Sequence, residues 1–228
     1  MTLARCGTRK VSPGKYHPCG ATLTPEGVNF ALYSQHAKEV FLVLFDTPQG
    51  SPTDIIPLKH RTKFVWHAFV HGLRAGQLYG YRVAGDFRPE HGLRFNPNKL
   101  LIDPYAKALS GKFVNEDNLL LAYDPLSPAR DLSLDPRDNA SIVPKSIVVE
   151  DSFDWQGDSL PDIPMEKLVI YETHLKGFTA HPSSQVQFPG TYLGFIGKIA
   201  HLQGLGVNAV ELLPVHEFCV EDFLAAKG

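Results

Sequence analysis

Short apolar runs that recur at nearly regular intervals constrain the fold more than any other feature of this chain. Five such runs, each closed by turn residues, span residues 28–33, 39–45, 54–58, 64–70 and 78–83. In the first, Val28, Phe30 and Leu32 alternate with less apolar residues, and this period of two is typical of a strand with one buried face. The run starts lie about 12 residues apart, which predicts a small antiparallel β-sandwich.

The second run differs from the others because residues 40–45 (VFLVLF) are apolar at every position. A strand that is apolar on both faces has to be covered on both faces. We therefore expect it to lie in the middle of its sheet.

The residue pattern changes over residues 85–164. Proline recurs at positions 89, 97, 104, 125, 128, 136, 144, 161 and 164, and no helical period can be found. So long an irregular segment is unusual inside a compact domain. We expect a connector that joins two domains, is wrapped over a surface and is held there by aromatic side chains such as Phe95, Tyr105, Phe153 and Trp155.

From residue 167 onward the pattern changes again. Residues 168–171 and 207–213 are apolar runs that predict buried strands, and residues 191–202 show the 3.6-residue spacing of an amphipathic helix. We expect Gly204 and Gly206 to end this helix by adopting left-handed backbone angles. Strand, helix and strand in this order form a βαβ unit, and its apolar strands indicate a parallel sheet covered on each face.

Charge and hydropathy exclude several classes of partner. The 228 residues carry 22 Lys and Arg against 24 Asp and Glu, a net charge of −2, whereas nucleic acids and anionic membranes are bound mainly through clustered basic residues. The longest apolar run is residues 40–45, far short of the ~20 residues that cross a bilayer. Because the first 20 residues contain no apolar stretch typical of a signal peptide, we expect a cytoplasmic protein.

Cysteine usage and the common motifs predict no cofactor. Cys6, Cys19 and Cys219 form no Cys-x-x-Cys pair, so we expect neither a disulfide framework nor a zinc site, and a set of Cys6, His17 and Cys19 is better read as free thiols and a histidine. No Gly-x-Ser-x-Gly elbow and no His-Glu-x-x-His motif occurs, which excludes the usual serine hydrolases and zinc proteases.

Candidate site residues follow from position. In (β/α) barrels the reacting groups lie at the carboxyl ends of the strands, which here singles out a set of residues just after the two apolar runs: Glu172, His174, Lys176, Pro214, His216 and Glu217. Two interpretations stay open for them: a ligand-facing role, or polar strand ends that satisfy backbone groups and ion pairs. Trp66 likewise either stacks on a sugar ring or belongs to the core.

Five sequence blocks resemble bacterial glycogen debranching enzymes and isoamylases. They occur in the family's order along nearly the whole chain: 72–83 (GLRAGQLYGYRV), 94–108 (RFNPNKLLIDPYAKA), 143–146 (VPKS), 169–179 (VIYETHLKGFT) and 205–218 (LGVNAVELLPVHEF). Branching enzymes and maltooligosyl-trehalose hydrolases share such a two-domain beginning, but the block at 94–108 favours the debranching type.

The resemblance implies both a fold and a partner. It implies an immunoglobulin-like, early-set β-sandwich, a carbohydrate-binding module of family 48, over residues 1–110. An irregular connector over 111–166 follows, and then the first βαβ unit of an incomplete (β/α)8 TIM barrel of glycoside hydrolase family 13 over 167–228. The implied partner is an α-glucan such as glycogen or limit dextrin, with α-1,6-glucosidic branch linkages as the substrate.

The family's three catalytic carboxylates lie beyond the second barrel strand, and this sequence ends at Gly228. We therefore assign no catalytic residue, give Glu172, His174, His216 and Trp66 as candidate substrate contacts, and expect the chain alone to be inactive. The alternatives are a non-catalytic α-glucan-binding protein, and a chain completed by a downstream polypeptide that carries the rest of the barrel.

Overall fold

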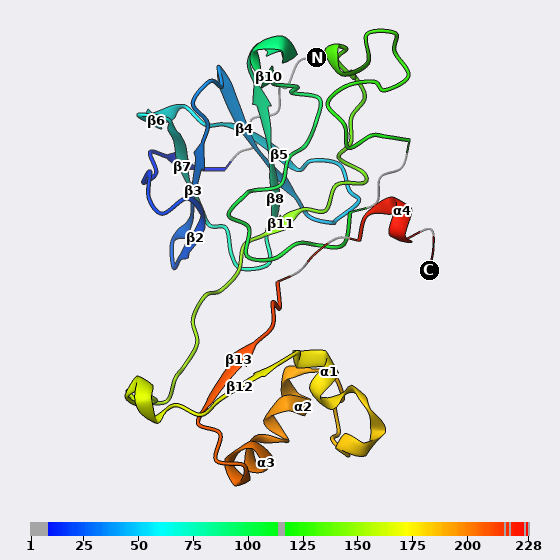
Figure 1. Ribbon diagram of the computed structural model, residues 1–228. Coiled ribbons are helices and arrows are strands. Elements are labelled where there is room, and N and C mark those ends of the chain that lie inside the picture. The colour runs from blue at the N-terminus through cyan, green and yellow to red at the C-terminus, as the bar shows by residue number, and fades with distance from the viewer. Residues whose placement is uncertain (1–8, 114–116, 217, 219, 226, 228) are drawn as a thin grey trace. The chain divides into compact units, whose positions relative to one another are not determined.

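The computed structural model describes residues 9–113, 117–216, 218, 220–225 and 227. Internal contacts divide the chain into two compact units, Met1–Phe153 and Asp154–Gly228 (Figure 1). Each unit is described by itself below.

The first unit contains two antiparallel sheets. In the first sheet the order is β1-β7-β3-β2, with β6 beside β7, and in the second it is β11-β8-β4-β5. The strands of the first sheet are β1 (Val11–Ser12), β2 (Gly20–Thr24), β3 (Gly27–Tyr33), β6 (His60–Thr62) and β7 (Val65–His71). Those of the second are β4 (Glu39–Phe45), β5 (Asp54–Pro57), β8 (Leu78–Ala84) and β11 (Ser146–Ile147). All five expected strands are confirmed, as β3, β4, β5, β7 and β8.

Smaller elements complete this unit. β9 (Phe87–Arg88) and β10 (Leu93–Arg94) form an antiparallel hairpin around the 3-10 turn η1 (Pro89–His91), and a second 3-10 turn, η2, spans Arg130–Leu132. The short strands β1, β2, β6 and β11 were not predicted, because two to five residues carry too little periodicity to be recognised.

The main core lies between the two sheets. Alternate residues of β3 and β4, among them Val28, Phe30, Leu42 and Leu44, are fully buried in one apolar cluster with side chains of β7 and β8. The rings of Phe30 and Tyr79 meet edge to face, with centroids 5.1 Å apart. The period of two along these strands therefore builds a β-sandwich.

A second apolar cluster covers the outer face of the β4–β8 sheet. It contains Val43 and Phe45 of β4 together with Leu100, Ala140 and Val143 from the irregular segment. This explains why β4 is apolar at every position: its even residues face the first sheet and its odd residues face the connector. The prediction that this strand is central is confirmed, since β4 lies between β8 and β5.

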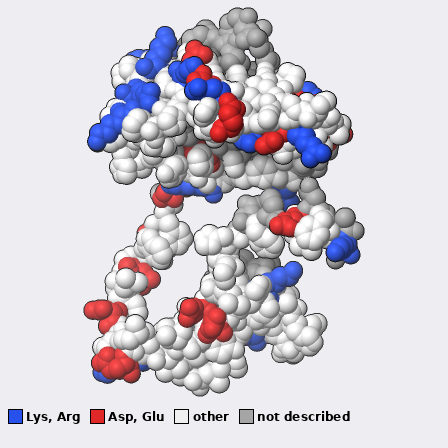
Figure 2. Space-filling view, turned by 45° about the horizontal axis from the view of Figure 1, so that its top comes forward, with Lys and Arg blue, Asp and Glu red and all other residues white. Residues whose placement is uncertain are grey.

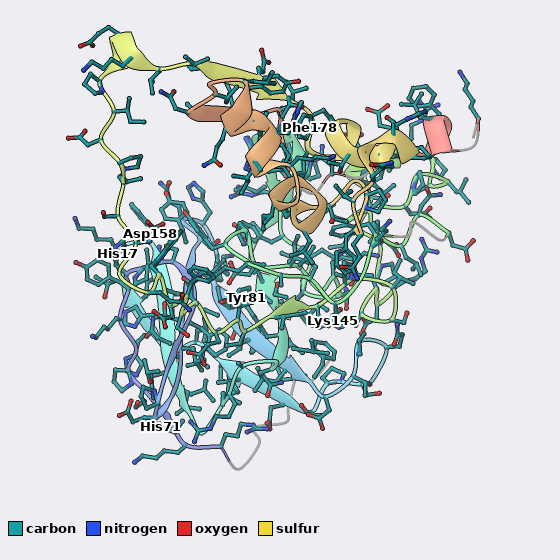
Figure 3. The ribbon with its side chains drawn as sticks, turned by 90° about the horizontal axis from the view of Figure 1, so that it is seen from below. His17, His71, Tyr81, Lys145, Asp158 and Phe178 are labelled. Carbon is teal, nitrogen blue, oxygen red and sulfur yellow. The ribbon has the colours of Figure 1, made fainter. Side chains whose placement is uncertain are left out.

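Buried polar side chains hold the irregular segment against this sheet (Figure 3). Lys145 is fully buried, and its ammonium donates hydrogen bonds to the carbonyls of Ala140 and Val143 and lies 4.9 Å from the centre of the Phe45 ring. Asn139 exchanges two hydrogen bonds with the backbone of Leu100. A backbone without sheet or helix partners needs such donors and acceptors, because an unpaired buried carbonyl is costly.

The four aromatic rings expected to hold the connector differ in burial. Phe95 does pack against the core, but Tyr105, Phe153 and Trp155 are 55%, 72% and 67% exposed. Apolar side chains such as Leu100 and Val143 and buried polar ones such as Lys145 also attach the segment, and no local period in the sequence predicts these contacts.

Gly14 offers a test of how closely the sheet and its preceding loop pack. A Cβ at this position would lie 2.5 Å from Oδ1 of Asn29 and 2.7 Å from the carbonyl carbon of Ala68. We expect Gly14→Ala to lower the free energy of unfolding by about 1–3 kcal/mol, as overpacking does. Urea denaturation checks this against Gly111→Ala, where a Cβ would meet nothing within 4 Å; equal midpoints for the two variants would contradict it.

The second unit contains two parallel strands with helices between them. β12 (Ile170–Thr173) pairs in register with β13 (Ala209–Leu212), so that Ile170 lies opposite Ala209. The helices are α1 (Leu175–Ala180), α2 (Tyr192–Ile196), α3 (Ile199–Gly204) and α4 (Asp222–Ala225), with 3-10 turns η3 (Met165–Lys167) and η4 (Pro182–Ser184). The strand–helix–strand order and the parallel pairing are as predicted.

Aromatic packing and one buried hydroxyl organise this unit. Phe178 of α1 contacts Tyr171 and Phe195, with ring centroids 5.7 and 5.0 Å away (Figure 3). Thr179 is fully buried, and its hydroxyl accepts a hydrogen bond from the backbone N–H of Gly190. These contacts hold α1 and α2 together.

Three local expectations for this unit were wrong. The helix expected over 191–202 is two short helices, α2 and α3, interrupted at Gly197 and Lys198. Gly206 has a positive φ of 81°, but Gly204 is the last residue of α3 and does not. The strands are not covered on each face either, since Tyr171 packs against Phe178 but Ile170 is 52% exposed and Val210 41%. Within the described part of the chain, no helix is long and apolar enough to cross a membrane.

Candidate functional site

The carboxyl ends of β12 and β13 place two glutamates side by side. Glu172 lies opposite Glu211 in the parallel register, and both are exposed. Residues in register on neighbouring parallel strands point to the same side of the sheet, so the two carboxylates share one face. Sequence reasoning missed Glu211 because it stands inside an apolar run that was read as fully buried.

The histidines near these strand ends have different surroundings. His174 precedes α1, and its Nδ1 accepts a hydrogen bond from the backbone N–H of Gly177 at 3.0 Å, so it caps the helix. This is the backbone-satisfying role that the sequence had left open beside a ligand-facing one. His216 is exposed in the coil after β13, and Glu217 lies outside the described residues.

Trp66 belongs to the core of the sandwich. Its side chain is part of the main apolar cluster, the residue is 9% exposed, and its Nε1 donates a hydrogen bond to the carbonyl of Ser34 at 3.1 Å. The Arg61 guanidinium lies 5.1 Å from the ring centre. Because so little of the ring is exposed, the hypothesis that Trp66 stacks on a sugar is not supported.

A cavity of about 580 Å³ opens in the first unit beside the end of β3. Tyr33, Ser34 and His36 line it on one side, and residues of the 92–104 segment, among them Phe95 and Leu101, line it on another. Its size falls in the range of small-ligand sites, which are mostly apolar with a few polar groups. Sequence analysis did not find this cavity, because it forms only when the connector folds back beside β3 and β8.

The titratable groups of the sandwich interior are structural. Asp103 is 1% exposed and accepts a hydrogen bond from the Tyr79 hydroxyl at 2.9 Å, while its backbone N–H donates to the Ser146 hydroxyl at 3.0 Å. Burial raises the pKa of Asp103 and also that of Tyr79. Perturbed groups can mark a functional site, but these are sealed inside the core and join the connector to β8.

Surface charge in the described residues is mixed. Basic and acidic side chains lie near one another on the face shown in Figure 2 rather than forming a surface of one sign. Among the described residues, no group of three His, Cys, Asp or Glu side chains is placed to hold a metal ion. The thiol of Cys19 is free, and Cys6 and Cys219 lie outside the described residues.

Comparison with known proteins finds a family model that matches the sandwich. Residues 18–106 match the family model of carbohydrate-binding module 48, the isoamylase N-terminal domain. The antiparallel sandwich of the first unit is therefore similar to a carbohydrate-binding module of family 48.

Two curated relatives match nearly the whole chain. The chain is 42% identical over 222 residues to the glycogen debranching enzyme of Enterobacter sp. (strain 638) and 44% identical over 221 residues to that of Yersinia enterocolitica. Both matches cover 96% of this chain and 32% of the relative. The chain thus resembles the amino-terminal portion of glycogen debranching enzymes and spans about a third of their length.

A solved structure agrees with the fold. The pullulanase of Paenibacillus barengoltzii, crystallised in complex with maltohexaose and α-cyclodextrin, superimposes with a TM-score of 0.64 at 25% identity. The match covers 89% of this chain and 28% of the pullulanase. It therefore includes parts of both units.

Proposed function

We propose that this chain is the amino-terminal part of an enzyme that hydrolyses α-1,6-glucosidic branch linkages in glycogen or limit dextrin. The observation that carries the proposal is the match to debranching enzymes at 42% identity over 96% of the chain. A family 48 carbohydrate-binding module within residues 18–106 supports an α-glucan as the bound partner.

In this proposal the two units have different roles. Residues 1–110 form an immunoglobulin-like, early-set sandwich that binds glucan, and residues 111–166 form the connector. Residues 167–228 open a (β/α)8 barrel, of which β12 and β13 are the first two strands. A cytoplasmic location accords with the free thiol of Cys19.

We expect this stretch by itself not to hydrolyse glucan. A retaining glycosidase needs two carboxyl groups about 5–5.5 Å apart, one ionised for attack and one kept protonated by its surroundings. Such groups are held at the top of a closed barrel of about 250 residues, whereas the second unit has 75 residues, Asp154–Gly228. Glu172 and Glu211 lie in register on a two-stranded sheet, and both are exposed.

The expected result for the purified chain is binding without hydrolysis. Electrophoresis in gels that contain glycogen should retard it relative to gels that contain none, while incubation with limit dextrin should release no reducing ends. Addition of a polypeptide that carries the remaining barrel would distinguish a complementing fragment, which gains activity, from a glucan-binding protein, which does not. Hydrolysis by the chain alone would contradict the incomplete barrel, and unchanged mobility would contradict glucan binding.

A further inference from the structure

An exposed aromatic corner lies at the end of β3. Tyr33 is the last residue of β3 and is 52% exposed, and Phe64, in the turn between β6 and β7, is 41% exposed. Their ring centroids are 6.2 Å apart and their planes are inclined at 72°. The two rings therefore form an open corner at the surface of the sandwich, which we call the Tyr33–Phe64 platform.

Polar groups border the platform. The Tyr33 hydroxyl donates a hydrogen bond to Oε1 of Gln35 at 3.3 Å, and Arg61 donates to the Gln35 carbonyl at 2.9 Å. The guanidinium of Arg61 also lies 5.6 Å from the centre of the Phe64 ring. An apolar surface rimmed by planar polar groups marks a binding site more often than a bare apolar patch does.

The backbone holds the platform rigidly. Val65 pairs with Tyr33 in the β3–β7 ladder, and the N–H of Ser34 donates to the carbonyl of Phe64 at 2.8 Å. Lys63 adopts a positive φ of 54° in the turn that precedes Phe64. A platform set on paired strands loses little conformational freedom when a ligand binds.

We propose that the Tyr33–Phe64 platform stacks the glucose rings of an α-glucan chain, an inference that rests on the proposed function. A glucose ring presents C–H groups on its faces and hydroxyls around its edge. The C–H faces suit the electron-rich face of an aromatic ring, and the hydroxyls suit the amide of Gln35 and the guanidinium of Arg61.

Two observations favour a glucan over other occupants. The two platform residues and the bordering Gln35 and Arg61 all lie inside the segment that matches the carbohydrate-binding module. Tyr33 also lines the cavity of about 580 Å³, so a chain stacked on this ring has a concave, mostly apolar surface next to it.

The test compares Tyr33→Ala and Phe64→Ala with the full-length wild-type chain, using maltoheptaose titration and retardation in glycogen gels. We expect each substitution to weaken binding about tenfold or more, as removal of a central aromatic contact does. Tyr33→Phe keeps the ring and should keep most of the affinity. Tyr16→Ala is the matched control, because Tyr16 is 56% exposed, does not line the cavity and lies outside residues 18–106, so its loss should leave binding unchanged.

Thermal unfolding of each variant separates lost contacts from lost structure, and exposed rings should leave the midpoint nearly unchanged. If Tyr33→Ala and Phe64→Ala bind glucan as tightly as the wild type does, the proposal for the platform is overturned and the proposed function stands. Failure of the wild type itself to bind would overturn the proposed glucan binding as well. The wild-type chain could also prove to be a dimer. If either substitution converts it to a monomer and leaves glucan binding unaltered, the two rings contact a second copy of the chain and the proposal is overturned.

Discussion

Asp135→Asn should lower the free energy of unfolding of the first unit by about 3–5 kcal/mol, the usual cost of removing one partner from a buried ion pair. Asp135 is 1% exposed, and its Oδ2 accepts a hydrogen bond from the ammonium of Lys99 at 2.9 Å. Lys99 is itself 3% exposed. The substitution leaves this ammonium buried without a counter-charge and can turn an amide N–H₂ toward it.

The carboxylate of Asp135 has hydrogen-bond partners besides Lys99. The carboxylate of Asp135 also accepts hydrogen bonds from the guanidinium and backbone N–H of Arg137. The backbone carbonyl of Asp135 accepts a hydrogen bond from Nδ2 of Asn96 at 2.7 Å. The side chain of Asp135 therefore joins its own stretch of the irregular segment to the stretch that contains Lys99.

Asp131→Asn is the matched control. Asp131 pairs with Arg94 at 2.8 Å, but the two side chains are 55% and 40% exposed. A solvent-exposed pair contributes at most about 1 kcal/mol. Urea denaturation followed by far-UV circular dichroism should therefore show a large shift for Asp135→Asn and almost none for Asp131→Asn, and similar shifts would refute the assignment of the buried clamp.

The same carboxylate gives the sign of a pH effect. Burial raises the pKa of Asp135, but hydrogen bonds from Arg137 and Lys99 outweigh burial and hold that pKa well below its ordinary value. A group with a lowered folded-state pKa contributes stability above its unfolded pKa, and this contribution is lost as the pH falls below that value. The wild type should lose stability below about pH 4, and Asp135→Asn should lose less over the same range.

Asp103 acts in the opposite direction, since burial raises its pKa and protonation favours the folded state. Both proteins retain Asp103. The difference between their acid profiles therefore reports Asp135, and parallel profiles would contradict its role.

The sandwich strands could be predicted because each carries its own signal. β3 alternates, and β4 is apolar throughout, so the core face of β3 and the two-sided burial of β4 could be predicted from local residues. The one-sided burial expected for β3 is wrong, because Asn29 and Ala31 on its other face are buried as well, and the backbone N–H of Lys15 donates a hydrogen bond to Oδ1 of Asn29 there. The buried ion pair between Lys99 and Asp135 could not be predicted, because the two residues stand 36 positions apart. No local pattern indicates that an ammonium and a carboxylate at that separation meet in the interior.

The candidate site was predicted less well for a related reason. Trp66 has the residue type expected of a sugar platform but lies in the core, while Tyr33 ends an alternating strand and was read only as part of that pattern. Tyr33 lies on the face of β3 opposite the core, where Asn29 and Ala31 are buried and Tyr33 is 52% exposed. Which residue of that face stays exposed depends on the chain that covers it, and this is a property of the packed sandwich rather than of the strand.

Limited proteolysis with chymotrypsin should cut first near residue 160 and leave a resistant fragment that contains the first hundred residues. Three large apolar side chains there are mostly exposed, Phe153 at 72%, Trp155 at 67% and Leu160 at 91%. Between residues 148 and 164 the backbone forms no strand or helix. Such a segment can enter a protease site without the cooperative unfolding that a paired strand requires.

After the first cut, the second unit should be degraded at least about tenfold faster than the first, because its local opening costs less free energy. Its two strands have unpaired outer edges among the described residues, and Ile196 is 58% exposed. The sandwich, by contrast, buries one sheet face against the other sheet and covers the outer face of β4 with the connector.

Leu160→Gly is a control for where the cut occurs. This substitution removes one chymotrypsin site in the segment and should slow the first cleavage while leaving the resistant fragment unchanged in stability. Mass spectrometry of the time course identifies the fragment ends. Equal resistance along the whole chain would show that the second unit is as stable as the sandwich, and would contradict the inference that two parallel strands with uncovered faces need the rest of a barrel to become protected.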